Sequence, residues 1–589
     1  MQIFKQLGWF FAQEKKRYLV GIAALFAVAL LQVIPPKVIG IVIDEIHQKE
    51  MNFSVVLRWG ALLIATALLQ YAFRYIWRRR IWGGAAKLEK ILRQRLFHHF
   101  MKMDTIFYQK HRTGDLMAHA TNDLTAIQNV AGAGILTFAD SLLTGGTTLV
   151  AMIFAVNWRL TLLALLPLPL LALFSKLLGA KLHDAFSNAQ AAFSMINDKT
   201  QESITGIKVI KAFGQEKEDI ADFEQKIEQT IKKNQKVNFL DALFDPVITV
   251  VIGLAYVLTI IYGGRLVINQ TITIGQLVTF ISYIGMLVWP MFAIGRLFNV
   301  LERGSASYER VHFLLGEKSE RFQPQEAVRD LVPGKMKYHV KEFTYPAEDG
   351  SAFQLQAVDF SLAPGETLGI VGRTGSGKTT ILKLLMREYD QYEGAIDYAG
   401  HDIRDYTLDS YFSHVGYVPQ DYFLFSMSVA DNIRFSNPQL PFEKVKEAAA
   451  IADVAEDIER FPEQYETMVG ERGVSLSGGQ KQRLSIARAL AVHPDLLILD
   501  DALSAVDAET EEEILQNLKA LHQNQAMIIC AHRLSSVMHA KEILVMEQGR
   551  VAERGTHAEL LAKNGWYAQM FRKQQLERKL GEELDDGKE

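Results

Sequence analysis

The sequence predicts an α-helical, membrane-spanning N-terminal half joined to an α/β C-terminal half. Three features of the 589 residues support this fold class: about six long apolar runs lie before residue 300, these runs stop near Gly316, and short apolar strands alternate with helices beyond it. Lys and Arg number 63 against 67 Asp and Glu, and the net charge of −4 disfavours a dedicated nucleic-acid binder. The single cysteine, Cys530, excludes an internal disulfide framework and a cysteine-cluster metal site.

The N-terminal half holds the predicted transmembrane domain, residues 1–315. Each apolar run is about as long as, or longer than, the roughly 20 residues that a helix needs to cross a bilayer. The six runs cover residues 18–43, 55–77, 133–156, 160–178, 244–267 and 277–298. Any one of them could be a buried helix of a soluble protein, but six in one half argue against that alternative. The two long polar connections, 79–130 and 179–243, contain few glycines and prolines, so we expect helical rods that extend beyond the membrane.

Basic residues set the predicted orientation of this domain. Clusters of Lys and Arg precede the first span, follow the second and precede the fifth, at 15–17, 78–80 and 232–236. Because cytoplasmic loops are enriched in Lys and Arg, we expect the N-terminus and both long connections in the cytoplasm. The first span is too long for a signal peptide, so we expect it to be retained.

A charged segment with two prolines, residues 316–336, is predicted to link the halves. Residues 337–575 are then expected to form the α/β domain, and residues 576–589 a charged C-terminal tail.

The α/β domain contains a match to the phosphate-binding P-loop pattern. The match lies between an apolar strand and a helix that continues with Thr380, and it reads Gly372-Arg373-Thr374-Gly375-Ser376-Gly377-Lys378-Thr379. The glycines let backbone N–H groups approach phosphates at a helix N-terminus. Lys378 is expected to reach the β- and γ-phosphates, and the Thr379 hydroxyl to ligate Mg²⁺.

A second motif, Leu496-Leu-Ile-Leu-Asp500, is an apolar strand that ends in an acid. Asp500 is placed to hold the Mg²⁺ shell, as a Walker B aspartate does. A buried strand with a capping aspartate is the alternative for this segment alone, and the P-loop upstream favours the metal-binding role. ATP with Mg²⁺ is therefore the expected cofactor pair.

Between these motifs lies a short glycine-rich segment, which reads Leu476-Ser477-Gly478-Gly479-Gln480 and is followed by Lys481-Gln482-Arg483. It resembles the signature of ATP-binding cassette (ABC) proteins. The resemblance implies that the signature meets the γ-phosphate of ATP bound by the opposite cassette, so that each ATP lies between two chains. A serine and glycines at a helix N-terminus suit that role, because they present donors to a phosphate.

Other elements of the ABC cassette occur in the order typical of the family. The resemblance implies that Tyr345 stacks on adenine, that Gln420 touches Mg²⁺ and senses the membrane domain, and that His532 contacts the γ-phosphate. Glu471 resembles the segment that faces the partner's coupling loop, and residues 504–507 resemble the D-loop that links the two ATP sites.

One position departs from the family pattern. In competent cassettes a glutamate follows the Walker B aspartate and polarises the attacking water, whereas here the pair is Asp500-Asp501. Asp501 is one methylene shorter, which removes about 1.5 Å of reach, and a general base must come within roughly 2.6–3.2 Å of its proton or act through a water. We predict a degenerate site with Asp501, His532 and Gln420 at the catalytic positions and Thr379, Gln420 and Asp500 as metal ligands. A harmless exchange of carboxylates is the alternative.

The resemblance covers nearly the whole chain. Residues 107–116 look like the first intracellular loop of ABC exporters, and residues 201–214 look like the segment that leads to the second coupling helix. Residues 157–161 and 303–307 are similar to segments of bacterial multidrug exporters. An intact signature beside a degenerate site is the pattern of one half of a heterodimeric exporter. The expected partner is a second half-transporter that carries the Walker B glutamate.

Two features of the spans are candidates for the substrate path. Asp140 lies inside the third run, where an acidic side chain is either functional or part of a structural hydrogen bond. Four aromatic residues of the sixth run either line a drug cavity or form a helix-packing stripe, namely Phe280, Tyr283, Trp289 and Phe292.

These features together predict ATP-driven efflux of amphipathic drugs or other hydrophobic compounds, often cationic, across the cytoplasmic membrane of a bacterium. Membrane lipid would surround the spans, and both termini would be cytoplasmic. A lipid or peptide exporter has the same architecture and remains an alternative. A soluble cassette protein would lack the spans, and an importer usually keeps its membrane and ATPase parts on separate chains.

Overall fold

The structure is a computed structural model that describes residues 2–48, 52–322, 327–329, 331–345, 353–470, 476–521 and 525–586. It divides into two compact units. The first contains Met1–Lys102 and Arg112–Glu317, and the second contains Met103–His111 and Lys318–Glu589.

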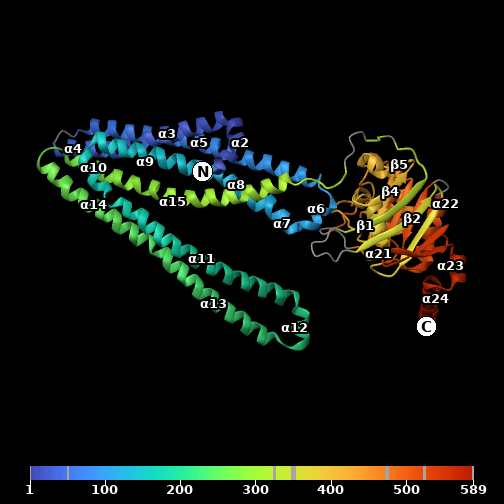
Figure 1. Ribbon diagram of the computed structural model, residues 1–589. Helices are drawn as coiled ribbons and strands as arrows, with labels where there is room; N and C mark the ends of the chain where they lie inside the picture. The colour runs from blue at the N-terminus through green and yellow to red at the C-terminus, as the bar shows by residue number, and fades with distance from the viewer. Residues whose placement is uncertain are drawn as a thin grey trace. The chain divides into compact units, whose positions relative to one another are not determined.

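The first unit is helical throughout its described elements (Figure 1). In chain order, the helices are α1 (Gln2–Gln6), α2 (Gly8–Gln13), α3 (Lys15–Gln32), α4 (Ile34–His47), α5 (Phe53–Phe100), α7 (Thr113–Ala118), α8 (Leu124–Asn129), α9 (Ile135–Ala155), α10 (Trp158–Leu165), α11 (Leu168–Thr205), α12 (Ile207–Phe213), α13 (Glu216–Ala242), α14 (Phe244–Ile268) and α15 (Ile274–Gly316). The π-helical turns η1 (His119–Asp123) and η2 (Val130–Gly134) join α7, α8 and α9 into one rod. Helices α11 and α13 run side by side and are connected by α12 (Figure 1).

Polar caps and prolines set where several of these helices begin. The Asn157 side chain accepts hydrogen bonds from two main-chain N–H groups at the start of α10. Thr273 and Gln276 cap α15 reciprocally, each side chain accepting from the other's main-chain N–H. Pro35 and Pro36 fall in the first turn of α4, where a missing N–H is tolerated.

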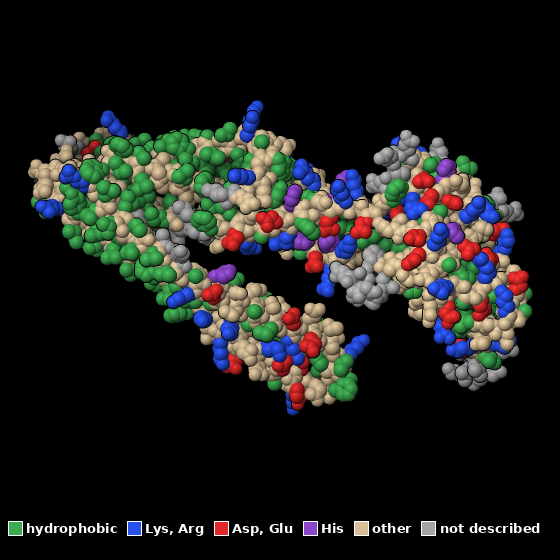
Figure 2. All heavy atoms as spheres, in the orientation of Figure 1, with side chains coloured by type: hydrophobic (Ala, Val, Ile, Leu, Met, Phe, Trp, Pro, Cys, Tyr) green, Lys and Arg blue, Asp and Glu red, His purple; other side chains and the backbone are tan. Residues whose placement is uncertain are grey.

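Five helical segments of the described residues are long and apolar enough to cross a membrane: Lys15–His47, Phe53–Phe100, Thr113–Ala155, Glu216–Ile268 and Ile274–Met291. The remaining predicted run, 160–178, falls on α10 and the start of α11, where some side chains lie outside the described part. On α5, Leu57, Ile64 and Leu68 are each 64% exposed. Figure 2 shows hydrophobic side chains gathered over the region of α3, α9 and α14 on the face drawn. Such exposure fits a lipid-facing surface, because lipid solvates apolar side chains and water does not.

The second unit contains two sheets with helices around them (Figure 1). The four-stranded sheet has the order β2-β1-β4-β5, and the six-stranded sheet has the order β10-β9-β3-β8-β7-β6. The strands are β1 (Met336–Thr344), β2 (Gln354–Leu362), β3 (Thr367–Gly372), β4 (Glu393–Tyr398), β5 (His401–Asp402), β6 (Val415–Val418), β7 (Leu496–Asp500), β8 (Ala526–Cys530), β9 (Glu542–Glu547) and β10 (Arg550–Gly555). The helices are α6 (Thr105–Lys110), α16 (Lys378–Leu385), α17 (Leu408–Phe412), α18 (Val429–Ile433), α19 (Phe442–Ile451), α20 (Ala455–Glu459), α21 (Gly478–Leu490), α22 (Ala508–Leu521), α23 (His557–Lys563) and α24 (Trp566–Asp586).

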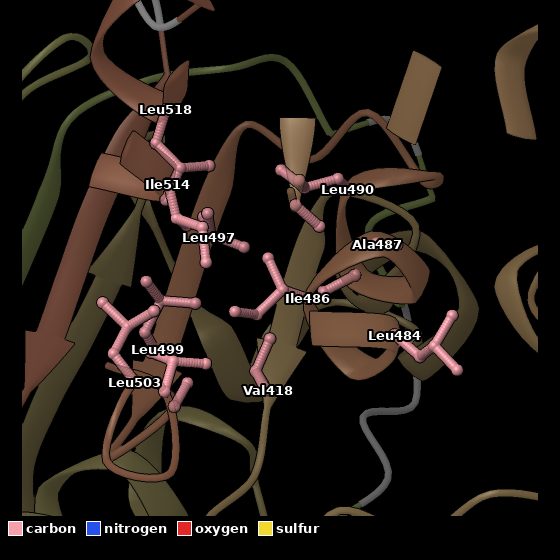
Figure 3. Packing of buried hydrophobic residues seen from close by; sticks show 14 of the residues in the cluster. Val418, Leu484, Ile486, Ala487, Leu490, Leu497, Leu499, Leu503, Ile514 and Leu518 are labelled. Carbon is pink, nitrogen blue, oxygen red and sulfur yellow. The ribbon is translucent and has the colours of Figure 1, made fainter. Parts of the chain in front are cut away.

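Strands β3, β6, β7 and β8 of the larger sheet are parallel, so their carboxyl ends meet at one edge. The register pairs Ile370 with Cys530 and Asp500 with Cys530. Strand β7 is buried along its whole length, as expected for a parallel strand covered on both faces. Figure 3 shows Leu497 and Leu499 of β7 packed among side chains of α21 and α22. This packing holds the carboxyl edge of the parallel strands, where the loops after β3, β6, β7 and β8 begin.

Helix α6 belongs to the α/β unit although it lies inside the range expected for the transmembrane domain. Asp104 caps it by accepting a hydrogen bond from a main-chain N–H of its first turn at 3.0 Å. Ile106 is buried in the core of the α/β unit. The Gln109 Oε1 atom accepts a hydrogen bond from the Tyr389 hydroxyl at 2.8 Å. The segment that resembles the first intracellular loop thus contributes a helix to the second unit.

Candidate nucleotide-binding site

A cavity of about 310 Å³ lies at the carboxyl edge of the parallel strands. Open α/β sheets bind ligands at this edge. Most of its lining comes from the loops that follow β3, β6, β7 and β8. The lining residues are Tyr345, Phe353, Thr374, Gly375, Ser376, Gly377, Lys378, Thr379, Thr380, Gln420, Asp500, Asp501, Cys530, Ala531 and His532.

The P-loop between β3 and α16 needs glycine at two positions in particular. Gly375 and Gly377 have φ angles of +78° and +104°, a region that residues with a Cβ rarely adopt. A Cβ on Gly377 would also lie 2.8 Å from the Phe353 ring. The loop therefore exposes its backbone to the cavity. The buried Ser376 hydroxyl has no hydrogen-bond partner among the described residues, so it is available to bind a phosphate oxygen.

Lys378 folds back over this loop. Its Nζ atom donates to the main-chain carbonyls of Gly372 and Arg373, at 2.9 and 3.2 Å. Gly372 and Arg373 do not line the cavity, and they contribute through these carbonyls. Burial lowers the pKa of the Lys378 amine, and the neighbouring groups of Cys530 and Asp501 oppose that shift.

Thr379 and Asp500 lie together beneath the loop. The Thr379 hydroxyl donates to Asp500 Oδ1 at 3.4 Å, and the buried Oδ2 atom has no hydrogen-bond partner. Burial raises the pKa of Asp500 to about 6; the hydrogen bond from Thr379 and the charge of Lys378 oppose that rise, and the Asp501 charge adds to it. A hydroxyl beside an unpaired carboxylate oxygen fits Mg²⁺, which takes few protein ligands and completes its shell with phosphate and water. No group of three His, Cys, Asp or Glu that could hold a metal occurs in the described ranges.

The main chain of Asp501 is tightly held. Its φ of +51° is in the left-handed region, its N–H donates to Cys530 O at 2.9 Å, and its carbonyl accepts from Gln482 Nε2 at 3.0 Å. Because the backbone is fixed from both sides, it does not shift easily to restore the reach that a shorter side chain loses.

Gln482 is a residue whose role the sequence did not predict. It is fully buried on α21, and its Oε1 atom accepts from the Ala505 N–H at 2.9 Å. Gln482 thus ties the helix that begins at the signature to the loop after β7. The available signal was its spacing from Ile486 and Ala489, which places it on the buried face of the helix.

Three further predicted residues reach the cavity from separate loops. The Tyr345 hydroxyl is hydrogen-bonded to Thr380 Oγ1 at 3.1 Å. Burial and the charge of Lys378 lower the pKa of His532, which favours a neutral imidazole. Gln420, two residues after β6, is exposed at the lining.

The signature residues lie elsewhere in the chain. Ser477, Gly478, Gly479 and Gln480 form the start of α21 and do not line the cavity. Ser477 Oγ accepts from the Gln480 N–H at 3.2 Å, and Gln480 Oε1 accepts from the Ser477 N–H at 3.1 Å. Glu471 lies outside the described residues. Within one chain, the predicted nucleotide-binding residues are therefore divided between the cavity and the start of α21.

In the helical unit, the structure separates the candidate substrate residues. Asp140 Oδ1 accepts a hydrogen bond from Thr144 Oγ1 of the same helix at 3.2 Å. Phe280 and Tyr283 are fully buried, and the Tyr283 hydroxyl donates to Val33 O at 2.9 Å, so these two rings pack between helices. Trp289 is 58% exposed. The side chain of Phe292 lies outside the described part.

Comparisons with known proteins agree with this architecture. The model of the ABC transporter transmembrane region matches residues 18–291, and the model described as ABC transporter matches residues 355–504. The multidrug resistance-like ATP-binding protein MdlA of Escherichia coli K12 is 44% identical over 589 residues, which cover 100% of this chain and 99% of MdlA. The probable multidrug resistance ABC transporter ATP-binding/permease protein YheI of Bacillus subtilis is 43% identical over 98% of each chain. A solved bacterial Atm1-family ABC exporter with ATP bound superposes with a TM-score of 0.75 at 24% identity, over 96% of this chain and 98% of that one.

Proposed function

The chain belongs to the ABC transporter family as an exporter half-transporter of the multidrug-resistance type, with a fused ATPase domain, and we propose that it works as one half of a heterodimer in the cytoplasmic membrane of a bacterium. Both termini and the two long helical connections lie in the cytoplasm in this proposal. The partner is a second half-transporter that carries a glutamate after its Walker B aspartate.

The separation of cavity and signature supports a second chain, and Asp501 in the place of the glutamate supports a partner that differs from this chain. Lys378, Asp500 and Asp501 line one cavity, whereas the signature at 477–480 begins another helix and does not reach it. A phosphate in the cavity would therefore lack the donors of a signature unless a second cassette supplied them. Two opposed chains would give each cavity a signature, because each signature then faces the other chain's P-loop.

A second surface supports a partner chain. Helix α12, in the segment that resembles the one leading to the second coupling helix, exposes apolar side chains although it lies in a polar connection: Ile207, Val209 and Phe213 are 44%, 61% and 76% exposed. Figure 2 shows charged side chains on the neighbouring parts of α11 and α13. Exposed apolar side chains with a charged surround are typical of a protein–protein contact. We assign this contact to the partner's cassette.

The roles of the nucleotide-site residues follow from their geometry. We assign adenine stacking to Tyr345, and phosphate binding to the P-loop backbone from Gly372 to Thr380 with Lys378. Thr379, Asp500 and Gln420 would hold Mg²⁺, which neutralises phosphate charge when bound. Neutral His532 would donate a hydrogen bond to the γ-phosphate. Asp501 would orient water poorly, so this chain's own site would bind ATP and turn it over slowly, and its intact signature would serve the partner's fast site.

We expect the transported substrates to be amphipathic, often cationic, drugs. Everted membrane vesicles that contain the complex should accumulate ethidium when ATP is added. If Asp140 faces the substrate, Asp140→Asn should weaken export of ethidium more than export of a neutral dye, because a carboxylate attracts only the cation. Initial rates of fluorescence change for the two dyes measure this difference.

Thr144→Val is the matched control, because it removes the hydrogen-bond partner of Asp140 and keeps the carboxylate. Equal losses for both dyes in both variants would make Asp140 a structural residue. The absence of any ATP-driven dye movement would favour a lipid or peptide exporter.

A further inference from the structure

The C-terminal helix α24 holds the loop that carries His532. Gln574 Nε2 donates to the His532 carbonyl at 2.9 Å, and Gln574 Oε1 accepts from the Leu534 N–H at 2.9 Å. The two hydrogen bonds fix the main chain on either side of Arg533. The Gln574 amide supplies both the donor and the acceptor of this contact, so both hydrogen bonds depend on one side chain.

Aromatic contacts with His557 hold helix α24 in place. Tyr567 is fully buried, and its hydroxyl is hydrogen-bonded to His557 Nδ1 at 2.7 Å. The Phe571 ring packs edge-on against the His557 ring, with centroids 4.9 Å apart. Phe571 follows Tyr567 by four residues and Gln574 follows Phe571 by three, a spacing that places the three side chains on one face of the helix. The face of α24 that packs against His557 therefore also carries Gln574, which contacts the loop of His532.

The same loop is held from a second direction. Arg533 Nη1 donates to the Val506 carbonyl and to Glu511 Oε2, both at 3.0 Å. The Ser535 hydroxyl donates to Glu511 Oε1 at 3.1 Å. Residues 532–535 are thus fixed between α24 on one side and the 504–507 segment with α22 on the other.

We propose that Gln574 is a positioning residue, which sets the place of the His532 imidazole at the cavity and, through Arg533, the place of residues 504–507. Gln574 does not line the cavity, so it acts through the loop. The inference rests on the proposed role of His532 at the γ-phosphate. Without the two hydrogen bonds the loop samples more conformations, and enclosing ATP then costs additional ordering entropy.

The test uses the complex of this chain with its partner. Gln574→Met keeps the length of the side chain and removes both hydrogen bonds. Backbone hydrogen exchange at Leu534 should become faster, because its acceptor is lost. Release of radiolabelled ATP from this chain, chased with unlabelled ATP, should become about ten-fold faster, as expected for two ordinary hydrogen bonds. Gln569→Met is the matched control, since Gln569 is an exposed glutamine of the same helix, and it should change neither quantity.

A double variant separates positioning from general support of the fold. If Gln574 acts through the imidazole, adding Gln574→Met to His532→Ala should not accelerate ATP release further. Additive effects, or unchanged exchange at Leu534 in Gln574→Met, would overturn the proposal. Should His532→Ala alone leave ATP release unchanged, the role proposed for His532 fails, and exchange at Leu534 alone then decides whether Gln574 holds the loop.

Discussion

Changing the partner's Walker B glutamate to glutamine is expected to lower steady-state ATP turnover by the purified complex about 10²–10⁴-fold, the usual cost of losing a positioned general base. Asp501→Asn in this chain should lower it by less than about two-fold, because the site that it belongs to already contributes little turnover. The backbone of Asp501 is held by Cys530 and Gln482, so we expect the loop to keep its place in Asp501→Asn.

Ser477→Ala gives an independent check on the same asymmetry. The Ser477 hydroxyl caps α21 and, in the proposed heterodimer, faces the γ-phosphate of the partner's competent site. Its loss should therefore reduce turnover strongly although the residue lies far along the chain from the P-loop. If Asp501→Asn were as damaging as the partner's Glu→Gln, the proposal of a degenerate site would be wrong.

Lys378→Ala is expected to remove photolabelling of this chain by an azido-ATP analogue, by at least about ten-fold, since a buried charged donor to phosphate is lost. The partner's labelling, resolved on the same gel, should persist and report that the complex is assembled. Lys444→Ala is the matched control, because Lys444 is an exposed lysine of α19 paired with Glu447. Unchanged labelling in Lys378→Ala would remove the P-loop assignment.

The nucleotide site was largely predictable because its chemistry lies in short contiguous motifs. The P-loop residues, Asp500 and His532 lie at or just after the end of an apolar strand, and parallel strands bring their carboxyl ends to one edge. Tyr345 and Gln420 line the same cavity, and the roles that the family resemblance gave them stay predictions. The helical membrane half is confirmed by the match to the ABC transporter transmembrane region, and it was predictable because long apolar runs have few alternatives to spanning helices.

Contacts between distant segments were not predictable from one sequence. Gln482 and Gln574 form hydrogen bonds with partners that only the fold brings close, and Phe353 lies beside Gly377 for the same reason. None of the three stands in a motif of its own. Helix α6 was expected within the transmembrane domain, but the burial of Ile106 and the hydrogen bond from Tyr389 to Gln109 place it in the α/β unit. Apolar periodicity could not reveal this, because a six-residue helix is too short to show which domain it packs against.

ATP-driven uptake of ethidium into everted vesicles, measured with this chain alone, the partner alone and the two together, tests the account most directly. We expect uptake only in vesicles that contain both chains, and its loss when the partner's Walker B glutamate is changed to glutamine. The account would be contradicted if vesicles with this chain alone took up ethidium and hydrolysed ATP at the full rate. One chain would then supply a competent site without the partner's glutamate.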